Sequence, residues 1–380
     1  MTRLQCDNAP VKRAVVAGGG VLGTWHALEL CQAGFTVTHL EAEAAPQGGS
    51  VRNFGLIWVS GRRTGDELDV AQRARQRWEE IGAVVPAVGF RASGSLTLAS
   101  TDGERRVMEE FAAHPDAAAR SITYVDRAEV AVLNPAVHGD IVGGLHCGMD
   151  AIVEPRRALG ALRDYISSLG SYAYQAGRRV VAVEEHALVD TTGTRWEADL
   201  IVVATGAAFD HLPGTEAVSA RLRRVRLQML ETEPYGEVLT TAVADADTLR
   251  YYPAYDVVPL DLLGPQNEIA AAHHLQLLLV QRADGGLTIG DTHAYDVPFD
   301  FALVEEPSVE LLERAARLLG SALPPVARRW EGVYAQCIDG AVCAREELSP
   351  AVWMVTGPGG RGMTCSPAIA ADTLVAAGVH

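Results

Sequence analysis

Residues 14–41 read AVVAGGGVLGTWHALELCQAGFTVTHLE, and this stretch decides the fold. The apolar run Ala14–Ala17 stops at three glycines, and apolar residues then recur at helical spacing as far as Leu28. Residues 36–40 form the next strand. Two strands joined by a helix become parallel neighbours with a right-handed crossover. We therefore expect an α/β fold whose first domain is Rossmann-like.

The glycines between the first strand and the helix satisfy the pattern G-x-G-x-x-G, which binds a dinucleotide when it stands in this context. The first glycine permits the tight turn, the second lets the backbone approach a pyrophosphate, and the third packs the helix against the strand. The phosphates then meet the positive end of the helix. The residues expected to hold them are Gly18, Gly20, Val21, Leu22 and Gly23.

Glu41 closes the second strand, 18 residues after Gly23. A carboxylate at this place accepts hydrogen bonds from both hydroxyls of an adenosine ribose and repels a 2′-phosphate. The glycines and Glu41 do not distinguish NAD from FAD, because both dinucleotides use the same βαβ unit.

The length of 380 residues favours two cooperating domains over a single core. The formal net charge of −16 opposes binding to nucleic acid and to anionic membrane surfaces, and no apolar run is long enough to cross a bilayer. The N-terminal stretch MTRLQCDNAPVKR lacks the apolar core of a signal peptide, so we expect a cytoplasmic protein. The six cysteines, Cys6 among them, include no C-x-x-C pair, which disfavours a zinc site or a redox dithiol.

The chain is expected to leave the first domain and return to it, with an antiparallel sheet in the second, substrate-binding domain. Near the C-terminus a glycine-rich loop leads into a helix that Ser366 should cap and Pro367 should begin. Helices are also expected over 66–81, 155–169 and 309–319, and strands over 95–99, 180–183, 199–204, 275–280, 287–289 and 352–355. The expected cofactor-binding domain comprises residues 1–85, 145–215 and 335–380, and the substrate-binding domain residues 86–144 and 216–334.

Residues 48–55, GGSVRNFG, resemble the second phosphate loop of the D-amino acid oxidase and glycine oxidase (DAO) family. Glu154-Pro155-Arg156, Val180 and Ala204-Thr205-Gly206 resemble further markers of that family in the same order, and residues 356–364 resemble its loop around the flavin ring. The resemblance spans nearly the whole chain and implies an FAD-dependent enzyme. It adds these cofactor-binding candidates: Gly49, Ser50, Arg52, Asn53, Val180, Ala204, Thr205, Gly206, Gly359, Gly360, Arg361, Gly362, Met363 and Thr364.

The C-terminal loop also has a physical reading of its own. Its glycines free backbone N–H groups to converge, and the following helix presents its positive end. Donors aimed in advance at the ring stabilise the negative charge that develops on reduction. Arg361 either adds a full positive charge there or is a solvated loop arginine. Some relatives attach flavin through a cysteine in the neighbourhood of Cys337 and Cys343, but no motif matches, so we expect non-covalent FAD.

The family resemblance implies oxidation of a small amine, by oxidative deamination or N-dealkylation. A hydride moves to the flavin, the imine hydrolyses, and dioxygen or another acceptor reoxidises the flavin. An amine that arrives unprotonated needs no dedicated base, so positioning dominates. More narrowly, SVRNFGLIW and GGRGMT resemble a bacterial clade associated with aminophosphonate breakdown, which implies 2-aminoethylphosphonate or its N-methyl form. Relatives carry an arginine for the substrate carboxylate where this chain has Tyr334, which weakens a plain amino acid as substrate.

Several candidates for the substrate pocket have equally simple structural explanations. His293 matches a family position near the flavin, or is a surface turn residue, and Trp58 walls the pocket or belongs to the core. Arg250 with Tyr251 and Tyr252 can bind an acidic group, although a solvated strand edge explains them slightly better. The pair Arg62 and Arg63 is expected to be exposed, and His273 with His274 should face opposite sides of a strand and bind no metal.

Four other functions stay open from the sequence. A flavin-dependent 2-hydroxy acid dehydrogenase or an amino acid oxidase would share the cofactor motifs and differ in the pocket. An NAD-dependent enzyme would explain Glu41 but leaves the C-terminal glycine loop without a role. A non-catalytic protein that retains the nucleotide fold would bind flavin that no amine reduces. The electron acceptor and the oligomeric state are not indicated by the sequence.

Overall fold

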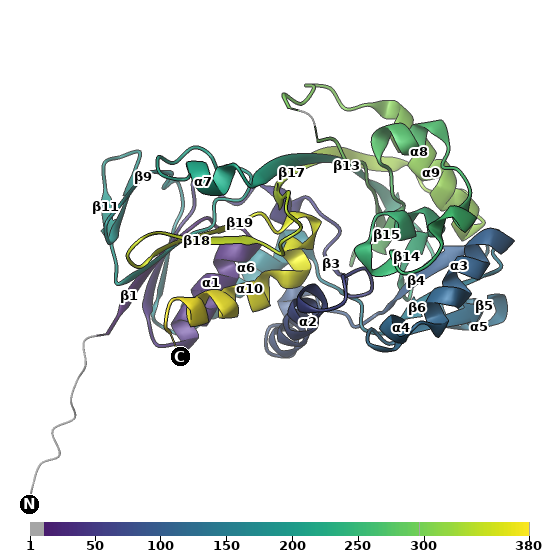
Figure 1. Cartoon of the computed structure of the whole chain (residues 1–380), viewed down its shortest axis with the longest axis horizontal. Helices are drawn as coiled ribbons and strands as arrows, with labels where there is room; N and C mark the ends of the chain where they lie inside the picture. The colour runs from purple at the N-terminus through teal and green to yellow at the C-terminus, as the bar shows by residue number, and fades with distance from the viewer. Residues whose placement is uncertain (1–10, 296, 380) are drawn as a thin grey trace, which may run out of the picture.

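The computed structural model describes residues 11–295 and 297–379, so the expectations for the N-terminal stretch and Cys6 lie outside the described residues. A six-stranded sheet carries the opening βαβ unit, with β1 flanked by β2 and β12 and every pair parallel except β18–β19 (Figure 1). The expected Rossmann-like domain is confirmed. Its strands in spatial order are β18 (Ala344–Ser349), β19 (Val352–Thr356), β12 (Leu200–Val203), β1 (Arg13–Ala17), β2 (Thr36–Leu40) and β8 (Tyr172–Gln175).

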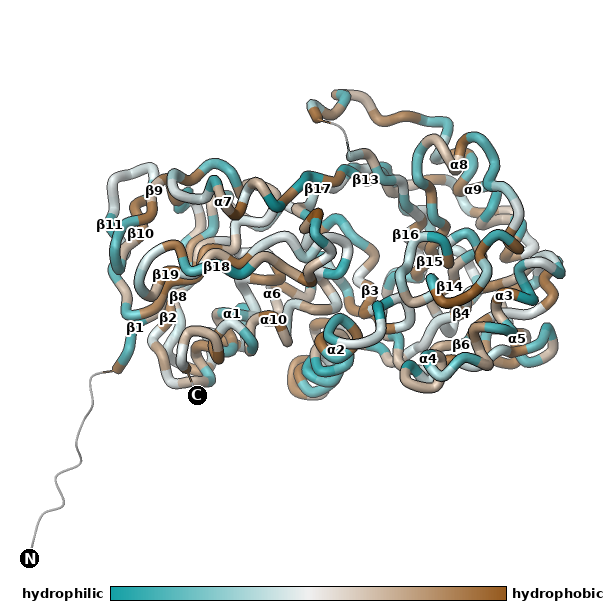
Figure 2. Tube along the Cα trace, in the orientation of Figure 1, coloured by the Kyte–Doolittle hydropathy of each residue, from teal (hydrophilic) through white to brown (hydrophobic). Residues whose placement is uncertain are grey.

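Helices cover one face of this sheet. Val16, Val37 and Val202 are completely buried on that face, against the apolar sides of four helices. Figure 2 shows hydrophilic and hydrophobic residues alternating along α2. Most of the apolar residues of this helix, such as Leu68 and Ile81, are buried. The helices are α1 (Val21–Gln32), α2 (Asp66–Val84), α6 (Pro155–Ser168) and α10 (Gly362–Ala376).

A small antiparallel sheet packs on the opposite face, where Val15 and Ile201 meet Leu188. The strand expected over 180–183 is present as β9, but the apolar run suggests a buried strand, whereas β9 lies in this small sheet and Val180 is its one buried residue. An apolar run of four therefore does not establish burial on both faces. The small sheet consists of β11 (Arg195–Glu197), β10 (Ala187–Asp190) and β9 (Val180–Glu184).

An eight-stranded sheet forms the other half of the molecule, antiparallel except where β14 pairs with β4 (Figure 1). Strands β6 and β17 run across the expected boundaries at 144/145 and 334/335. Strand β15 begins at Leu278 rather than 275, and α9 begins at Glu305 rather than 309. The strands in spatial order are β17 (Val326–Cys337), β13 (Leu222–Pro234), β16 (Gly286–Gly290), β15 (Leu278–Gln281), β14 (Ala242–Asp245), β4 (Ser95–Ala99), β6 (Gly143–Cys147) and β5 (Ile122–Asp126).

Short elements complete the chain. The strands β3 (Leu56–Ile57) and β7 (Ala151–Ile152) pair with each other outside the larger sheets, and none of the helices in the described ranges is both long and apolar enough to cross a bilayer. The remaining helices are α3 (Asp102–Ala113), α4 (Pro115–Ala118), α5 (Arg127–Leu133), α7 (Glu216–Ser219), α8 (Glu268–His273) and α9 (Glu305–Leu319).

Candidate active site

A cavity of about 560 Å³ extends from the first turn of α1 to the first turn of α10 and into the eight-stranded sheet. Most of the segments expected to bind the cofactor contribute to its wall. The exceptions are Glu41, residues 154–156 and Val180. The lining includes Gly20–Leu22, the loop 49–54, the turn after β12, and residues 358–363. One continuous cavity therefore joins the dinucleotide turn to the C-terminal glycine loop.

The turn before α1 is packed so closely that side chains are excluded. Gly18 has φ +114°, and a Cβ there would lie 2.2 Å from the carbonyl oxygen of Ala204. A Cβ on Gly23 would lie 1.9 Å from the carbonyl oxygen of Gly18. The Ser50 hydroxyl accepts the N–H of Val21 at 2.9 Å, which joins the second phosphate loop to the first. These contacts fit the close backbone approach that a pyrophosphate site requires.

Glu41 and Val180 lie outside the cavity wall. One oxygen of the Glu41 carboxylate accepts the N–H of Gly19 at 2.7 Å and the other accepts the N–H of Glu43 at 2.9 Å. The carboxylate is thus fixed beside the glycine turn and keeps lone pairs for a further donor. Its bond to a ribose stays a prediction.

The C-terminal loop differs from expectation in where its helix begins. Helix α10 starts at Gly362, after a short 3₁₀ turn over Gly359–Arg361, and Pro367 lies inside it. Pro367 has no N–H to offer the carbonyl of Met363, and that carbonyl instead accepts the indole N–H of Trp78 at 2.8 Å. The Ser366 hydroxyl donates to the Gly362 carbonyl within the helix and is not a cap. The positive end of α10 is therefore at the cavity.

These features fit FAD. An extended dinucleotide needs a long cavity whose walls include backbone, and the segments that line it here are rich in glycine. Cys337 lines the cavity and Cys343 does not. Burial raises the pKa of both thiols to about 11, so neither is a ready nucleophile at neutral pH. When bound, FAD would supply the acceptor for two electrons and a proton from the substrate.

The six residues expected at the substrate all line the cavity. His293 is buried rather than a surface residue, and burial lowers the pKa of its imidazole to about 4. Arg361 is half-buried and donates to the carbonyl oxygens of Pro358 and Ala341, at 3.1 and 2.8 Å, so it is not a solvated loop arginine. The six residues are Trp58, Arg250, Tyr251, His293, Tyr334 and Arg361.

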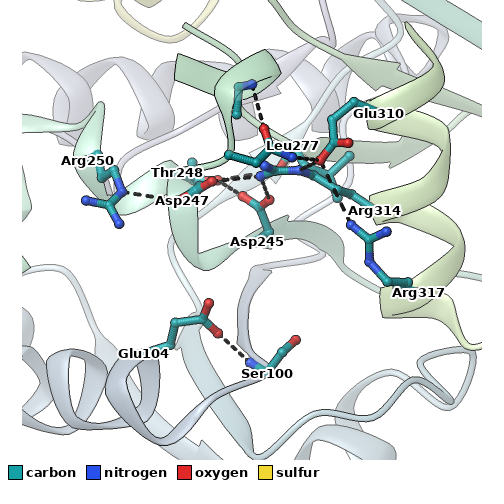
Figure 3. Close-up of polar contacts among 12 residues, drawn as sticks. Ser100, Glu104, Asp245, Asp247, Thr248, Arg250, Leu277, Glu310, Arg314 and Arg317 are labelled. Carbon is teal, nitrogen blue, oxygen red and sulfur yellow. Dashed lines mark hydrogen bonds and ion pairs between the residues drawn. The ribbon is translucent and has the colours of Figure 1, made fainter. Parts of the chain in front are cut away.

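Two structural expectations for basic residues at this site are wrong. Arg62 is buried on the cavity wall, where it donates to the Trp58 carbonyl at 2.7 Å and lies over the ring of Tyr252. Arg63 is exposed as expected, although it also reaches the wall. Arg250 ends a 3₁₀ turn (Ala246–Arg250) and does not lie on a strand edge, and its guanidinium pairs with Asp247 at 3.1 Å (Figure 3).

Several polar residues of the wall carry buried atoms without a hydrogen-bond partner in the described ranges. Among the described residues, the hydroxyl of Tyr334, the indole N–H of Trp58 and one oxygen of Asp291 are buried without a hydrogen-bond partner. The same holds for one oxygen each of Gln276 and Glu67. Buried polar atoms are mostly hydrogen-bonded in proteins, so these atoms on the cavity wall are candidates to bind a ligand there. No sequence signal for Gln276 or Glu67 stands out, because both lie inside ordinary secondary-structure patterns.

His273 and His274 are not on a strand. His273 ends α8, and His274 follows it in the left-handed conformation at φ +45°. Neither belongs to a metal-binding cluster, since the described residues contain no group of three or more histidine, cysteine, aspartate or glutamate side chains suited to a metal ion.

Comparisons with known proteins agree with this geometry. A family model described as FAD dependent oxidoreductase (DAO) matches residues 13–375. One subunit of the opine oxidase of Rhizobium meliloti is 26% identical over 238 residues, which span 57% of this chain and 62%, less than two thirds, of that protein. Glycine oxidase from Geobacillus kaustophilus superposes with a TM-score of 0.77 at 18% identity over 96% of this chain and 95% of that chain. Iminodiacetate oxidase from Chelativorans sp. BNC1 superposes with a TM-score of 0.70 at 17% identity over 97% and 95% of the two chains. The structural likenesses concern the fold, and the family match over almost the whole sequence shows that this chain belongs to the DAO family of FAD-dependent oxidoreductases.

Proposed function

We propose that this protein oxidises a small amine that also carries an acidic group, with 2-aminoethylphosphonate or its N-methyl form as the leading substrate. The observation that carries the proposal is a single cavity that joins the cofactor segments to a pocket of aromatic residues with Arg62 buried in its wall. A buried guanidinium beside tyrosines is suited to a phosphonate or carboxylate. Glycine oxidase, iminodiacetate oxidase and opine oxidase are named for substrates of the amine class.

The two large sheets are proposed to bind different partners, one the cofactor and the other the substrate. The six-stranded half holds the dinucleotide, and the eight-stranded half with the segment 246–263 forms the substrate side. Trp58 and Tyr252 exclude water, and Arg62 with Tyr334 orients the acidic group so that the carbon bearing the amine faces the N-terminus of α10. FAD, when bound, would accept the hydride from that carbon, and water then hydrolyses the imine. Dioxygen is the proposed final acceptor.

Tyr334 supports an acidic group other than the carboxylate of a plain amino acid. The side chain stands on β17 at the cavity, and its hydroxyl has no partner among the described residues. A tyrosine supplies one hydrogen bond where an arginine would supply a planar fork that matches a carboxylate. A tetrahedral phosphonate accepts such single donors from several directions.

The test begins with the visible spectrum of the purified protein, followed by anaerobic addition of 2-aminoethylphosphonate, its N-methyl derivative, glycine, sarcosine and a 2-hydroxy acid. Bleaching of the flavin by the aminophosphonates alone, with release of ammonia or methylamine, supports the proposal. Bleaching by glycine or by the hydroxy acid assigns an amino acid oxidase or a hydroxy acid dehydrogenase instead. Arg62→Met should raise the KM for an aminophosphonate, while Arg127→Met, at an exposed site, should not.

A further inference from the structure

We propose that Asp291 binds the amino group of the substrate and takes one proton from it, so that the amine is oxidised with a free electron pair. This inference rests on the proposed amine oxidation. Asp291 directly follows β16 and lines the cavity, and only 6% of its surface is exposed. One carboxyl oxygen is buried without a hydrogen-bond partner among the described residues, so the side chain has no evident structural task.

No positive charge compensates the carboxyl. Among the described residues, Asp291 forms no ion pair with an arginine or lysine; its nearest basic group is the ring nitrogen Nε2 of His293, 3.9 Å from Oδ2. Arg62 lies over the ring of Tyr252, and Arg223 lies over the ring of Tyr295. The titratable groups that face Asp291 are Tyr251 and Tyr252 of the segment after β14, Tyr334 of β17, and His293 and Tyr295 of its own loop.

His293 leaves the carboxyl uncharged rather than pairing with it. The Nδ1 atom of His293 lies 3.1 Å from the carbonyl oxygen of His274, and a carbonyl only accepts, so Nδ1 carries the ring proton. The Nε2 atom therefore turns a lone pair toward Asp291, which disfavours a carboxylate. Burial raises the pKa of Asp291 to about 8 and lowers the pKa of His293 to about 4.

Burial makes the proton transfer feasible. An alkylammonium has a pKa of about 10.4 and an ordinary aspartate a pKa of about 3.9. The equilibrium constant for proton transfer from the ammonium to the carboxylate is then unfavourable by a factor of roughly a million. With the pKa of Asp291 near 8 before the amine enters, the unfavourable ratio falls toward roughly a hundred, and the charge of the bound ammonium restores part of it. The entering ammonium displaces the carboxyl's own proton to water, because a nearby positive charge favours the carboxylate. An N–H bond then breaks, an O–H bond forms on Asp291, and the electron pair stays on nitrogen.

The protonation state is tested without any substrate, by infrared spectroscopy of the FAD-loaded protein. The wild type should show the carbonyl stretch of a protonated carboxylic acid that disappears as the pH rises through about 8. Asp291→Asn should lack that band, and Asp256→Asn, at an exposed position, should keep it. A wild-type spectrum with no such titrating band, or one that persists in Asp291→Asn, overturns the inference.

The role toward the amine is tested by anaerobic flavin reduction with N-methyl-2-aminoethylphosphonate and with sarcosine. Asp291→Asn should slow reduction about 100-fold near neutral pH and recover about tenfold for each pH unit, as solution supplies more of the free amine. A residue that only supports the fold would lower the rate equally at every pH, and that outcome excludes the base. If neither amine reduces the wild type, the proposed function fails with it, whereas a wild-type pH profile in Asp291→Asn removes this inference alone.

Discussion

The guanidinium of Arg314 donates to the carboxylate of Asp247 at 2.7 Å, and that same carboxylate pairs with Arg250 on the cavity wall. Arg314 also contacts Asp245 at 3.0 Å and Glu310 of its own helix at 2.6 Å, so one cation bridges three acids beside the end of β14 (Figure 3). The position of Arg250 therefore depends on a residue of α9 that does not reach the cavity.

Replacing Arg314 by methionine should destabilise the fold by about 3–5 kcal/mol, because buried acids are left without their partner. Desolvation and the neighbouring Asp247 already raise the pKa of Asp245 to about 6, and losing Arg314 raises it further. A carboxyl whose folded pKa is raised costs stability as the pH rises toward that pKa. Well below pH 6 the Asp245 carboxyl is protonated in both proteins, so its part of the deficit should be smallest there and grow as the pH rises above about 6. Urea unfolding at several pH values measures the effect.

Arg317→Met is the matched control on the same helix. The Arg317 side chain is 63% exposed, and its guanidinium lies as far as 4.0 Å from the carboxylate of Glu310. Its removal should therefore cost under about 1 kcal/mol of folding stability. Equal losses in the two variants would show that the network around Asp245 contributes no more than an exposed pair.

Asp291→Asn should change how stability depends on pH. The wild-type carboxyl has a pKa of about 8 in the fold against about 3.8 when exposed, so its contribution is present below about pH 4 and is lost as the pH rises through 8. That difference is on the order of 5 kcal/mol. The asparagine keeps the shape and does not ionise, so the variant should become the more stable protein as the pH rises. Two urea-unfolding curves that stay parallel across this range would contradict the buried neutral carboxyl.

Gly23→Ala should abolish FAD binding, because its Cβ would lie 1.9 Å from the carbonyl oxygen of Gly18 and would force the turn open. Gly160→Ala is the control: this glycine is also inside a helix, and its Cβ would meet nothing within 4 Å. The control should retain FAD and gain about 0.5–1 kcal/mol from helix propensity. The flavin-to-protein absorbance ratio after purification distinguishes the two. A yellow Gly23→Ala protein would show that the turn tolerates a side chain.

Features set by neighbouring residues could be predicted from the sequence. The glycine turn, β2 and the loop 48–55 depend on local backbone geometry, and the structure places them as expected. The start of α10 was not predictable from Ser366 and Pro367, because the carbonyl that Pro367 leaves free is satisfied by Trp78, almost three hundred residues earlier in the chain. A local capping signal carries no information about such a distant donor.

The chemistry of the pocket wall was predicted only in part for the same reason. Arg62 and Arg63 are equivalent in the sequence, yet one is buried and the other exposed. The difference comes from the segment 58–60, which Asp150 fixes by accepting the N–H groups of Val59 and Ser60 at 2.6 and 3.0 Å. Burial of Asp291 likewise depends on tyrosines from two other parts of the chain, and the sequence around Asp291 does not indicate them.

Replacing Glu67 by glutamine tests whether Arg62 and Arg361 of the cavity wall bind an anion. Its buried carboxylate lies 3.7 Å from Arg62 and 3.4 Å from Arg361, and it leaves these three groups with a net charge of +1. Glu67→Gln keeps the shape and raises that charge to +2. The variant should bind methylphosphonate, which has no amine to oxidise, about tenfold more tightly, or about 1.4 kcal/mol.

The affinity is measured from the perturbation of the bound flavin's absorbance during titration with methylphosphonate. Glu67→Gln should also lose about 1–3 kcal/mol of stability, because the guanidinium groups of Arg62 and Arg361 then repel one another without an intervening carboxylate. Asp66→Asn is the control, since this neighbouring acid is exposed and its removal alters the net charge equally. If both variants bind methylphosphonate with wild-type affinity, Arg62 and Arg361 do not hold the acidic group, and the other arginines of the cavity wall, Arg250 among them, become the candidates.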